Sequence, residues 1–233
     1  MRRPVTTTSF DYDQNPERFR LGTRVTQQHL TASSLYDHLA EMLRREDPRR
    51  IFDIGCGEGA LREALPPRLR QRVVGLDASA TMLRAHPPPV VQADATALPV
   101  RTATFDTVVA VNVFDHLDDP AVAIAEARRV LAQGGVFVAA TASRDDSPEL
   151  AQVWRPPRSP FDAENGPPLV ASVFGQVHTE RWDAPLIRLP DRDAVRDYLI
   201  ARFMTPGDAN TAAAQVVTPI TLTKRGVVIR ARK

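Results

Sequence analysis

The segment IFDIGCGEG, from Ile51 to Gly59, constrains the fold of this chain more than any other stretch. An apolar run that contains Asp53 leads there into three glycines at alternate positions. Glycine allows a strand to turn sharply into a helix and allows a ligand to approach the backbone closely. The segment therefore predicts a strand, a tight turn and a short helix, with a ligand site at the turn.

Strand and helix patterns alternate on both sides of this turn. Apolar strands are expected at 49–54, at 72–77, near 90–91, at 105–113 and at 135–141, with helical segments between them. Strands that are apolar on both faces and separated by helices are typical of a parallel sheet covered on both sides. The predicted fold class is α/β.

Capping residues and apolar periodicity locate the helices. An amphipathic stripe that begins near Leu35 predicts a helix ended by Asp47. Asp119 followed by Pro120 predicts another helix start, and the glycines at 134–135 are expected to stop that helix. The first twenty or so residues are polar and are expected to be irregular.

The chain is expected to form a single domain over 1–233. Residues 142–175 are rich in proline and charge, and we interpret them as an insertion on the substrate side of the sheet. A strand near 177–182, a helix capped by Asp191 and a terminal strand at 226–232 follow.

The composition excludes several classes of protein. An apolar share of 43% and a charged share of 25% are ordinary for a globular protein. No apolar run is long enough to span a bilayer or to act as a signal peptide, so we expect a cytoplasmic protein without a membrane partner. Thirty cations face 28 anions without a long cationic block, so no nucleic-acid partner is expected.

Acidic side chains at the predicted strand ends indicate the kind of ligand. Asp53 and Glu58 flank the glycine turn, where carboxylates repel a pyrophosphate but suit an ammonium group. Asp77 ends the second strand, where a carboxylate can accept hydrogen bonds from ribose hydroxyls, as it also does in NAD enzymes. Asp94 ends the third strand, where it can meet an adenine amino group. A sulfonium nucleoside fits these positions better than a dinucleotide.

In this order, the motifs IFDIGCGEG, VVGLDAS, VVQADATALP, FDTVVAVNVFDHLDDP and EARRVLAQGGVFV resemble those of class I S-adenosylmethionine-dependent methyltransferases, specifically the small-molecule type that includes quinone-biosynthesis enzymes. The resemblance spans 50–141. It implies a Rossmann-like sheet of seven strands with the last strand antiparallel, and S-adenosylmethionine as cofactor with S-adenosylhomocysteine as product. It also implies that residues 1–46 fold over the cofactor as a helical lid.

The resemblance assigns roles to individual residues. Asp53, Gly55 and Gly57 would surround the methionine part of the cofactor, Asp77 the ribose, Asp94 and Ala95 the adenine, and Asn112 with Val113 the sulfonium. The full set of predicted cofactor-binding residues is Asp53, Gly55, Cys56, Gly57, Asp77, Ala78, Asp94, Ala95, Asn112 and Val113.

Two residues after the fourth strand are candidates for catalysis. His116 is placed where a general base could take a proton from an acceptor hydroxyl or amine, although a structural role is the simpler interpretation. Asp115 departs from the usual residue of the family and could face the substrate. Cys56 could be a nucleophile, but a small apolar filler of the turn is favoured. No metal site is expected.

Other side chains leave alternatives open. Asp11, Tyr12, Phe19, Arg20 and His29 belong either to the lid or to the solvated surface, and Arg20 or Arg24 could bind a carboxylate. A second group of side chains either lines an aromatic acceptor pocket or belongs to the core: Trp154, Phe161, Phe174 and Trp182. The cationic end from Lys224 to Lys233 either attracts RNA or forms a strand with one exposed face.

The predicted function is methyl transfer from S-adenosylmethionine to a small-molecule acceptor, by O- or N-methylation. Two alternatives stay open: a methyltransferase for RNA or protein, and a protein that binds the cofactor without transferring methyl. An NAD-dependent oxidoreductase is disfavoured by the acidic turn.

Overall fold

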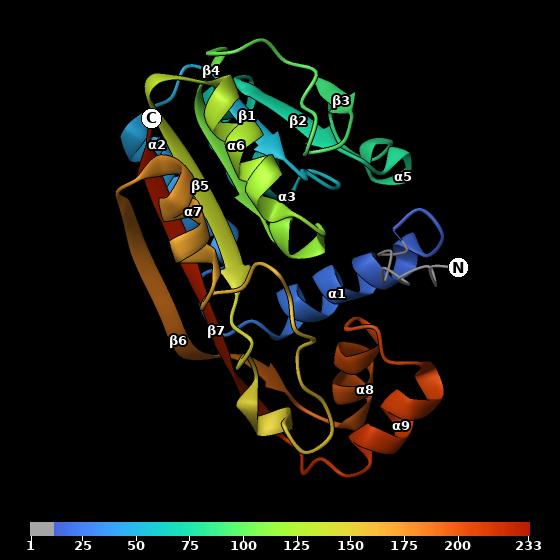
Figure 1. Ribbon diagram of the computed structural model, residues 1–233. Helices are drawn as coiled ribbons and strands as arrows, with labels where there is room; N and C mark the ends of the chain where they lie inside the picture. Colours follow the sequence, from blue (N-terminus) through green and yellow to red (C-terminus); the bar gives the residue numbers. More distant parts are fainter. Residues whose placement is uncertain (1–11) are drawn as a thin grey trace, which may run out of the picture.

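A sheet of seven strands organises the part of the chain that the computed structural model describes, residues 12–233 (Figure 1). The strand order is β3-β2-β1-β4-β5-β7-β6. All strands run parallel except β7, which is antiparallel to both of its neighbours. The predicted fold class and the antiparallel last strand are confirmed. The strands are β1 (Ile51–Ile54), β2 (Val73–Asp77), β3 (Val90–Gln92), β4 (Phe105–Val111), β5 (Leu131–Ala142), β6 (Val177–Leu189) and β7 (Ile220–Arg232).

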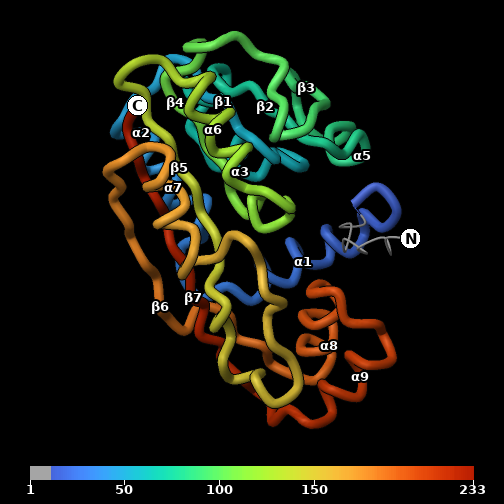
Figure 2. The backbone as a smooth tube through the Cα atoms, viewed as in Figure 1, coloured from blue at the N-terminus to red at the C-terminus, as the bar shows by residue number. Residues whose placement is uncertain are grey.

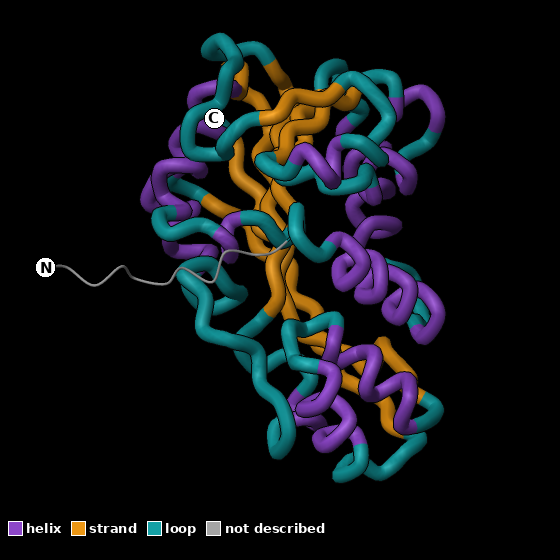
Figure 3. Tube along the Cα trace, turned by 90° about the vertical axis from the view of Figure 1, so that its right-hand side faces the viewer, coloured by secondary structure: helices purple, strands orange, loops and turns teal. Residues whose placement is uncertain are grey.

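Helices cover both faces of this sheet, as the side view in Figure 3 shows. They are α1 (Pro16–His29), α2 (Leu35–Glu46), α3 (Ala60–Ala64), α4 (Pro67–Arg70), α5 (Ala80–Leu83), α6 (Pro120–Val130), α7 (Gly166–Phe174), α8 (Arg192–Ile200) and α9 (Pro206–Ala213), with 3-10 turns η1 (Phe114–His116) and η2 (Pro148–Leu150). None of these helices has the length and apolar content needed to cross a membrane.

Alternating strand residues build two separate cores. Phe52 of β1 and Phe137 of β5 point into the core under α6 and α7. Ile51 and Val138 point into the opposite core, which α2, α3 and α4 cover. Because successive side chains of a strand face opposite sides, the fully apolar central strands serve both cores at once.

A third apolar cluster lies at the far end of the two longest strands. β6 and β7 have 13 residues each and continue past β5 as a pair, on which α8 and α9 pack. Tyr198 and Leu199 of α8 are fully buried there, together with Val25 of α1. We call α8, α9 and this cluster the cap. In Figure 1, α1 runs between the cap and the rest of the molecule.

Two sequence predictions are wrong in detail. The expected irregular start of the chain contains α1 from Pro16, because Asn15 caps the helix by accepting a hydrogen bond from the Arg18 amide. The helix that begins at Pro120 ends at Val130, before the glycines, because β5 already starts at Leu131.

Three helices were not predicted from the sequence: α4, which begins at Pro67, and α7 and α9. α7 begins with Gly166-Pro167-Pro168, and α9 begins with Pro206, next to the capping residue Thr205. Proline is tolerated in the first turn of a helix, so these prolines start helices and do not only mark loops. α7 packs in the first core beside α6, at the end of the long connection from β5 that Figure 2 traces. An insertion over 142–175 stays a prediction.

The N-cap of α6 provides a test of the local structure. The Asp119 side chain accepts a hydrogen bond of 3.1 Å from the Ala121 amide. Asp119→Ala should lower the free energy of unfolding by about 1 kcal/mol, since the cap is lost. Asp119→Asn, which keeps a capping oxygen, should stay close to the parent chain in urea unfolding. Equal loss in both variants would contradict the capping role.

Candidate active site

The glycine turn between β1 and α3 requires its glycines. Gly55, Gly57 and Gly59 have φ of +66°, +53° and +98°, a region that favours glycine. A Cβ atom on Gly55 would also lie 2.2 Å from Cγ2 of Val113, which follows β4. The turn therefore packs against the end of β4, which brings two predicted site segments together.

Asp77 ties this turn to the loop after β2. Its Oδ2 accepts a hydrogen bond of 2.9 Å from the Gly57 amide, and its Oδ1 accepts one of 2.9 Å from the Ser79 amide. Each carboxylate oxygen retains further acceptor capacity. Asp77 can therefore hold both loops and still accept hydrogen bonds from a ligand.

Asp53 is a buried carboxyl group beside Asp77. Its side chain is 3% exposed, and Oδ2 has no hydrogen-bond partner among the described residues. Burial, followed by the negative charge of Asp77, raises the pKa of Asp53 to about 8. A cationic group placed against this oxygen would supply the missing partner and stabilise the ionised carboxylate.

Two other predicted positions lie on the same edge of the sheet. Asp94 is exposed, and its Oδ1 accepts hydrogen bonds of 2.7 Å from both the amide and the hydroxyl of Thr96. Asn112 is exposed with a φ of 51°, and its amide donates to the carbonyl of Ala140. The carboxyl ends of parallel strands form the usual ligand-binding edge of such a sheet.

The segment 12–20 lies over this edge. Asp13 accepts hydrogen bonds from the Ser79 hydroxyl (2.6 Å) and the Thr81 amide (3.1 Å). Phe19 Cζ lies 3.7 Å from the position of a Cβ on Gly57. The predicted residue Asp11 lies outside the described residues. Sequence reasoning missed Asp13, because no local pattern indicates a partner 66 positions away.

Arg20 is fixed by two carboxylates. Its guanidinium contacts Glu58 at 2.7 Å and Glu17 at 2.6 Å. The pair with Arg20 neutralises the charge of Glu58, which the sequence analysis had expected to suit a ligand ammonium group. The same pair holds α1 against the glycine turn. Asp53 is the flanking carboxylate of the turn that retains an unpartnered oxygen.

His116 and Asp115 lie in η1, directly after β4. The Tyr12 hydroxyl lies 3.0 Å from His116 Nε2, and His116 Nδ1 lies 3.6 Å from Asp115 Oδ2. Asp115 Oδ1 is buried without a hydrogen-bond partner among residues 12–233, and burial raises the pKa of this carboxyl. The two catalytic candidates therefore lie side by side, and Tyr12 contacts His116.

Cys56 is buried in the turn, and burial, reinforced by the nearby Asp53 and Asp77, raises the pKa of its thiol. A thiol that stays protonated is a poor nucleophile, which agrees with a filler of the turn. In the part of the chain that is described, no group of three or more His, Cys, Asp or Glu side chains is placed to hold a metal ion.

The aromatic candidates do not form one pocket. Phe161 contacts the ring of Phe114 at 5.2 Å in the first core. Trp182 packs against the second core, and Trp154 packs against the cap. These side chains therefore belong to three different cores, as the simpler interpretation predicted.

Several C-terminal cations form ion pairs with acidic side chains of the same chain. Arg225 and Arg232 form ion pairs with Asp183 (3.1 Å) and Glu46 (2.9 Å), and Lys224 pairs with Asp146. Most of these positive charges therefore have partners inside the fold.

The central part of the chain is similar to a known protein family. Residues 52–139 match a family model described as "Methyltransferase domain". The match starts inside β1 and ends inside β5, so it contains the glycine turn, Asp77, Asp94 and η1. The family match therefore covers the strands and loops that carry the candidate site.

Curated relatives named as methyltransferases are similar to part of this chain. A malonyl-[acyl-carrier protein] O-methyltransferase of Hahella chejuensis is 34% identical over 151 residues, which cover 57% of this chain and 54% of the relative. A ubiquinone biosynthesis O-methyltransferase of Methylobacterium sp. is 41% identical over 109 residues, covering 40% of this chain and 41% of the relative. The chain thus spans about half the length of the curated relatives it matches.

Solved structures share the fold over most of the length of this chain. A possible histamine N-methyltransferase of Thermotoga maritima matches with a TM-score of 0.59 and 17% identity, over 95% of this chain and 98% of that one. The [4+2]-cyclase SpnF matches with a TM-score of 0.57 and 15% identity, over 97% and 95%. At this identity, the likeness establishes the fold.

The buried carboxyl of Asp53 predicts a pH-dependent stability. With a pKa near 8 in the folded protein and 3.8 as its ordinary value, Asp53 stabilises the fold below about pH 4, and this contribution is lost as pH rises to about 8. Within that window its effect is about 1.4 kcal/mol per unit of pH. Asp53→Asn should flatten the fall in unfolding free energy measured between pH 5 and pH 8.

The exposed residue Asp145 serves as the matched control, since Asp145→Asn should leave the pH profile unchanged. An Asp53→Asn profile that coincides with that of the parent chain would show that Asp53 is ionised at neutral pH in the folded protein.

Proposed function

We propose that this chain is an S-adenosylmethionine-dependent methyltransferase that acts on a small-molecule acceptor. The observation that carries the proposal is the arrangement of Asp53, the glycine turn and Asp77 along the carboxyl edge of the sheet, within the part that matches the family. The methyltransferase names of the relatives from Hahella and Methylobacterium support the same activity.

The residues at this edge fit the cofactor. The unpartnered oxygen of Asp53 suits the ammonium group of a methionine moiety, and the glycine turn lets that moiety approach the backbone. Asp77 would accept hydrogen bonds from the ribose hydroxyls. Asp94 and Ala95 would meet the adenine, and Asn112 with Val113 would lie on the sulfonium side.

When bound, S-adenosylmethionine supplies an electrophilic methyl group. The chain would contribute by positioning the acceptor and by keeping water out, which lowers the barrier of a direct displacement. The contacts of Asp13, Phe19 and Arg20 hold segment 12–20 over the site and would exclude solvent. His116 would take the proton that a hydroxyl or amine acceptor loses.

A protein that holds the cofactor without methylating is the second candidate. It is favoured by the likeness to a solved structure named as a [4+2]-cyclase, because the same fold carries a different reaction there. An RNA or protein methyltransferase is less supported, because the C-terminal cations that could attract RNA pair within the fold. A cytoplasmic location stays a prediction.

Calorimetric titration with S-adenosylhomocysteine, beside NAD and NADP, tests the cofactor. We expect saturable binding of S-adenosylhomocysteine alone. Asp77→Ala should weaken that binding by roughly tenfold to hundredfold, since hydrogen bonds to a charged acceptor are lost. Affinity equal to that of the parent chain would contradict the placement of the ribose.

Asp145→Ala, at an exposed carboxylate distant in sequence from the turn, is the control for net charge and should bind as the parent chain does. Once binding is established, incubation with S-adenosylmethionine labelled in its methyl group and a panel of hydroxylated, amino and carboxylate acceptors separates the two candidates. Label transfer supports a methyltransferase, and binding without transfer to any acceptor supports the second candidate.

A further inference from the structure

Arg20 joins the start of α1 to the glycine turn. Its Nε donates a hydrogen bond of 2.8 Å to Oε1 of Glu58, and its Nη2 lies 2.7 Å from the same oxygen. Glu17, one turn earlier in α1, contacts Nη1 of the guanidinium at 2.6 Å. Glu58 itself lies between Gly57 and Gly59. The ion pair therefore fastens a helix directly to the backbone segment that would carry the cofactor.

Phe19 lies over the glycine turn beside this ion pair. Its Cζ is 3.7 Å from the position of a Cβ atom on Gly57, which is an ordinary contact distance. The Gly57 amide donates to Asp77, the residue proposed to hold the ribose. The ring thus lies where the methionine part of a cofactor would approach the backbone. Access to the turn therefore depends on the position of segment 12–20.

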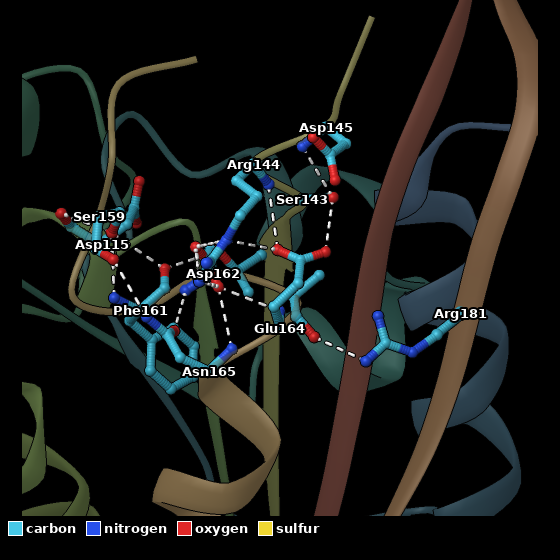
Figure 4. Close-up of polar contacts among 12 residues, drawn as sticks. Asp115, Ser143, Arg144, Asp145, Ser159, Phe161, Asp162, Glu164, Asn165 and Arg181 are labelled. Carbon is cyan, nitrogen blue, oxygen red and sulfur yellow. Dashed lines mark hydrogen bonds and ion pairs between the residues drawn. The ribbon is translucent and has the colours of Figure 1, made fainter. Parts of the chain in front are cut away.

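The connection from β5 to α7, which meets η1, is fastened by buried groups (Figure 4). Asp162 is 5% exposed and accepts hydrogen bonds of 2.9 Å from Arg144 and from the Asn165 amide. The Asn165 side chain donates to the Ser159 carbonyl, and the Ser159 hydroxyl donates to the Asp115 carbonyl at 3.3 Å. Buried polar groups that are hydrogen-bonded in this way rigidify the structure around them. This connection is therefore a fixed support of η1.

The polar contacts of segment 12–20 are much more accessible to water. The side chains of Arg20 and Glu58 are 37% and 25% exposed. Asp13, which accepts a hydrogen bond from the Ser79 hydroxyl, is exposed as well. Ion pairs in contact with water are screened by salt and contribute little to stability. Segment 12–20 is therefore the side of the site that opens at low cost.

α1 is attached to the cap more firmly than to the glycine turn. Val25 is 6% exposed within the cap cluster, and Arg18, 8% exposed, stacks on the Phe203 ring at 3.6 Å. Toward the turn, α1 is held by the partly exposed pair of Arg20 with Glu58. The start of α1 can therefore part from the turn while the helix stays packed on the cap.

We propose that the ion pair between Arg20 and Glu58 is a latch that gates the exchange of the cofactor. The closed latch keeps Phe19 on the glycine turn, and the open latch exposes the turn and so admits or releases the cofactor. The latch rests on the proposed function, because it acts at the site assigned to S-adenosylmethionine, and it adds a control of the exchange rate. The competing explanation is that the pair only stabilises the bound cofactor or the folded chain.

Association and dissociation rates separate these explanations. Surface plasmon resonance measures both rates for S-adenosylhomocysteine on the parent chain, Arg20→Gln and Arg44→Gln. Arg44→Gln is the matched control, since it removes the same charge from an ion pair with Glu41 within α2. A gate that opens more often speeds entry and exit alike, so the dissociation constant should stay nearly unchanged. We expect both rate constants to rise roughly two- to fivefold in Arg20→Gln, the effect of losing a partly exposed ion pair.

The control variant should keep the rates of the parent chain. Faster dissociation of Arg20→Gln with an unchanged association rate would overturn the latch, because the pair would then only stabilise the bound cofactor. Two unchanged rates would overturn it as well. If the parent chain does not bind S-adenosylhomocysteine at all, the proposed function itself fails, and the latch fails with it.

Salt provides a second readout that needs no variant to fold. Raising sodium chloride from about 0.05 M to about 0.5 M screens a partly exposed ion pair. S-adenosylhomocysteine carries no net charge near neutral pH, so salt has little effect on its encounter with the chain. Both rates of the parent chain should rise with salt, whereas those of Arg20→Gln should change much less. An equal salt response in the two chains contradicts the latch.

Glu58→Gln tests whether the two side chains act as one unit. If they do, Glu58→Gln and the double variant should associate with S-adenosylhomocysteine as fast as Arg20→Gln does, because each change breaks the same contact. Association rates that multiply in the double variant would show that the two side chains act independently, and would overturn the latch.

Discussion

The carboxylate of Asp77 accepts a backbone hydrogen bond from the glycine turn and another from the loop after β2. These two loops begin where neighbouring parallel strands end, and a single side chain fixes their separation. The Val113 side chain packs on Gly55, so the end of β4 is held against the same glycine turn. The shape of the candidate cofactor site depends on this arrangement, because each element that lies over the site is attached to one of these loops.

The candidate site contains two neighbouring acids, the buried Asp53 and the half-buried Asp77. Asp53 and Asp77 are close enough for the charge of Asp77 to raise the pKa of Asp53, and the nearby Arg20 is occupied by Glu58 and Glu17. Such a site disfavours an anionic group and favours a ligand that brings its own positive charge. A sulfonium amino acid has this property, whereas a pyrophosphate lacks it. Electrostatics therefore support the choice of cofactor independently of the resemblance in sequence.

Two groups of elements lie outside residues 52–139: segment 12–20 with α1, and the cap. Segment 12–20 and α1 lie across the carboxyl edge of the sheet, and the cap packs on the far end of β6 and β7. α1 contacts both regions: Arg18 stacks on the Phe203 ring at 3.6 Å beside the cap, while Phe19 faces the glycine turn. Consecutive residues of one helix thus connect the cap with the cofactor side.

The sequence by itself determined the α/β class, the strand positions, the glycine turn and the acids at the strand ends, because these features depend on local periodicity and on residues whose backbone requirements are specific. It did not reveal α1, α4, α7 or α9: α1 is polar along most of its length, and prolines at the starts of α4, α7 and α9 resemble loop signals. Only the tertiary structure decided that Glu58 pairs with Arg20, that the aromatic side chains divide among three cores, and that Tyr12 meets His116. These contacts join residues far apart in the chain, up to 104 positions for Tyr12 and His116, so no local pattern encodes them and folding alone brings them together.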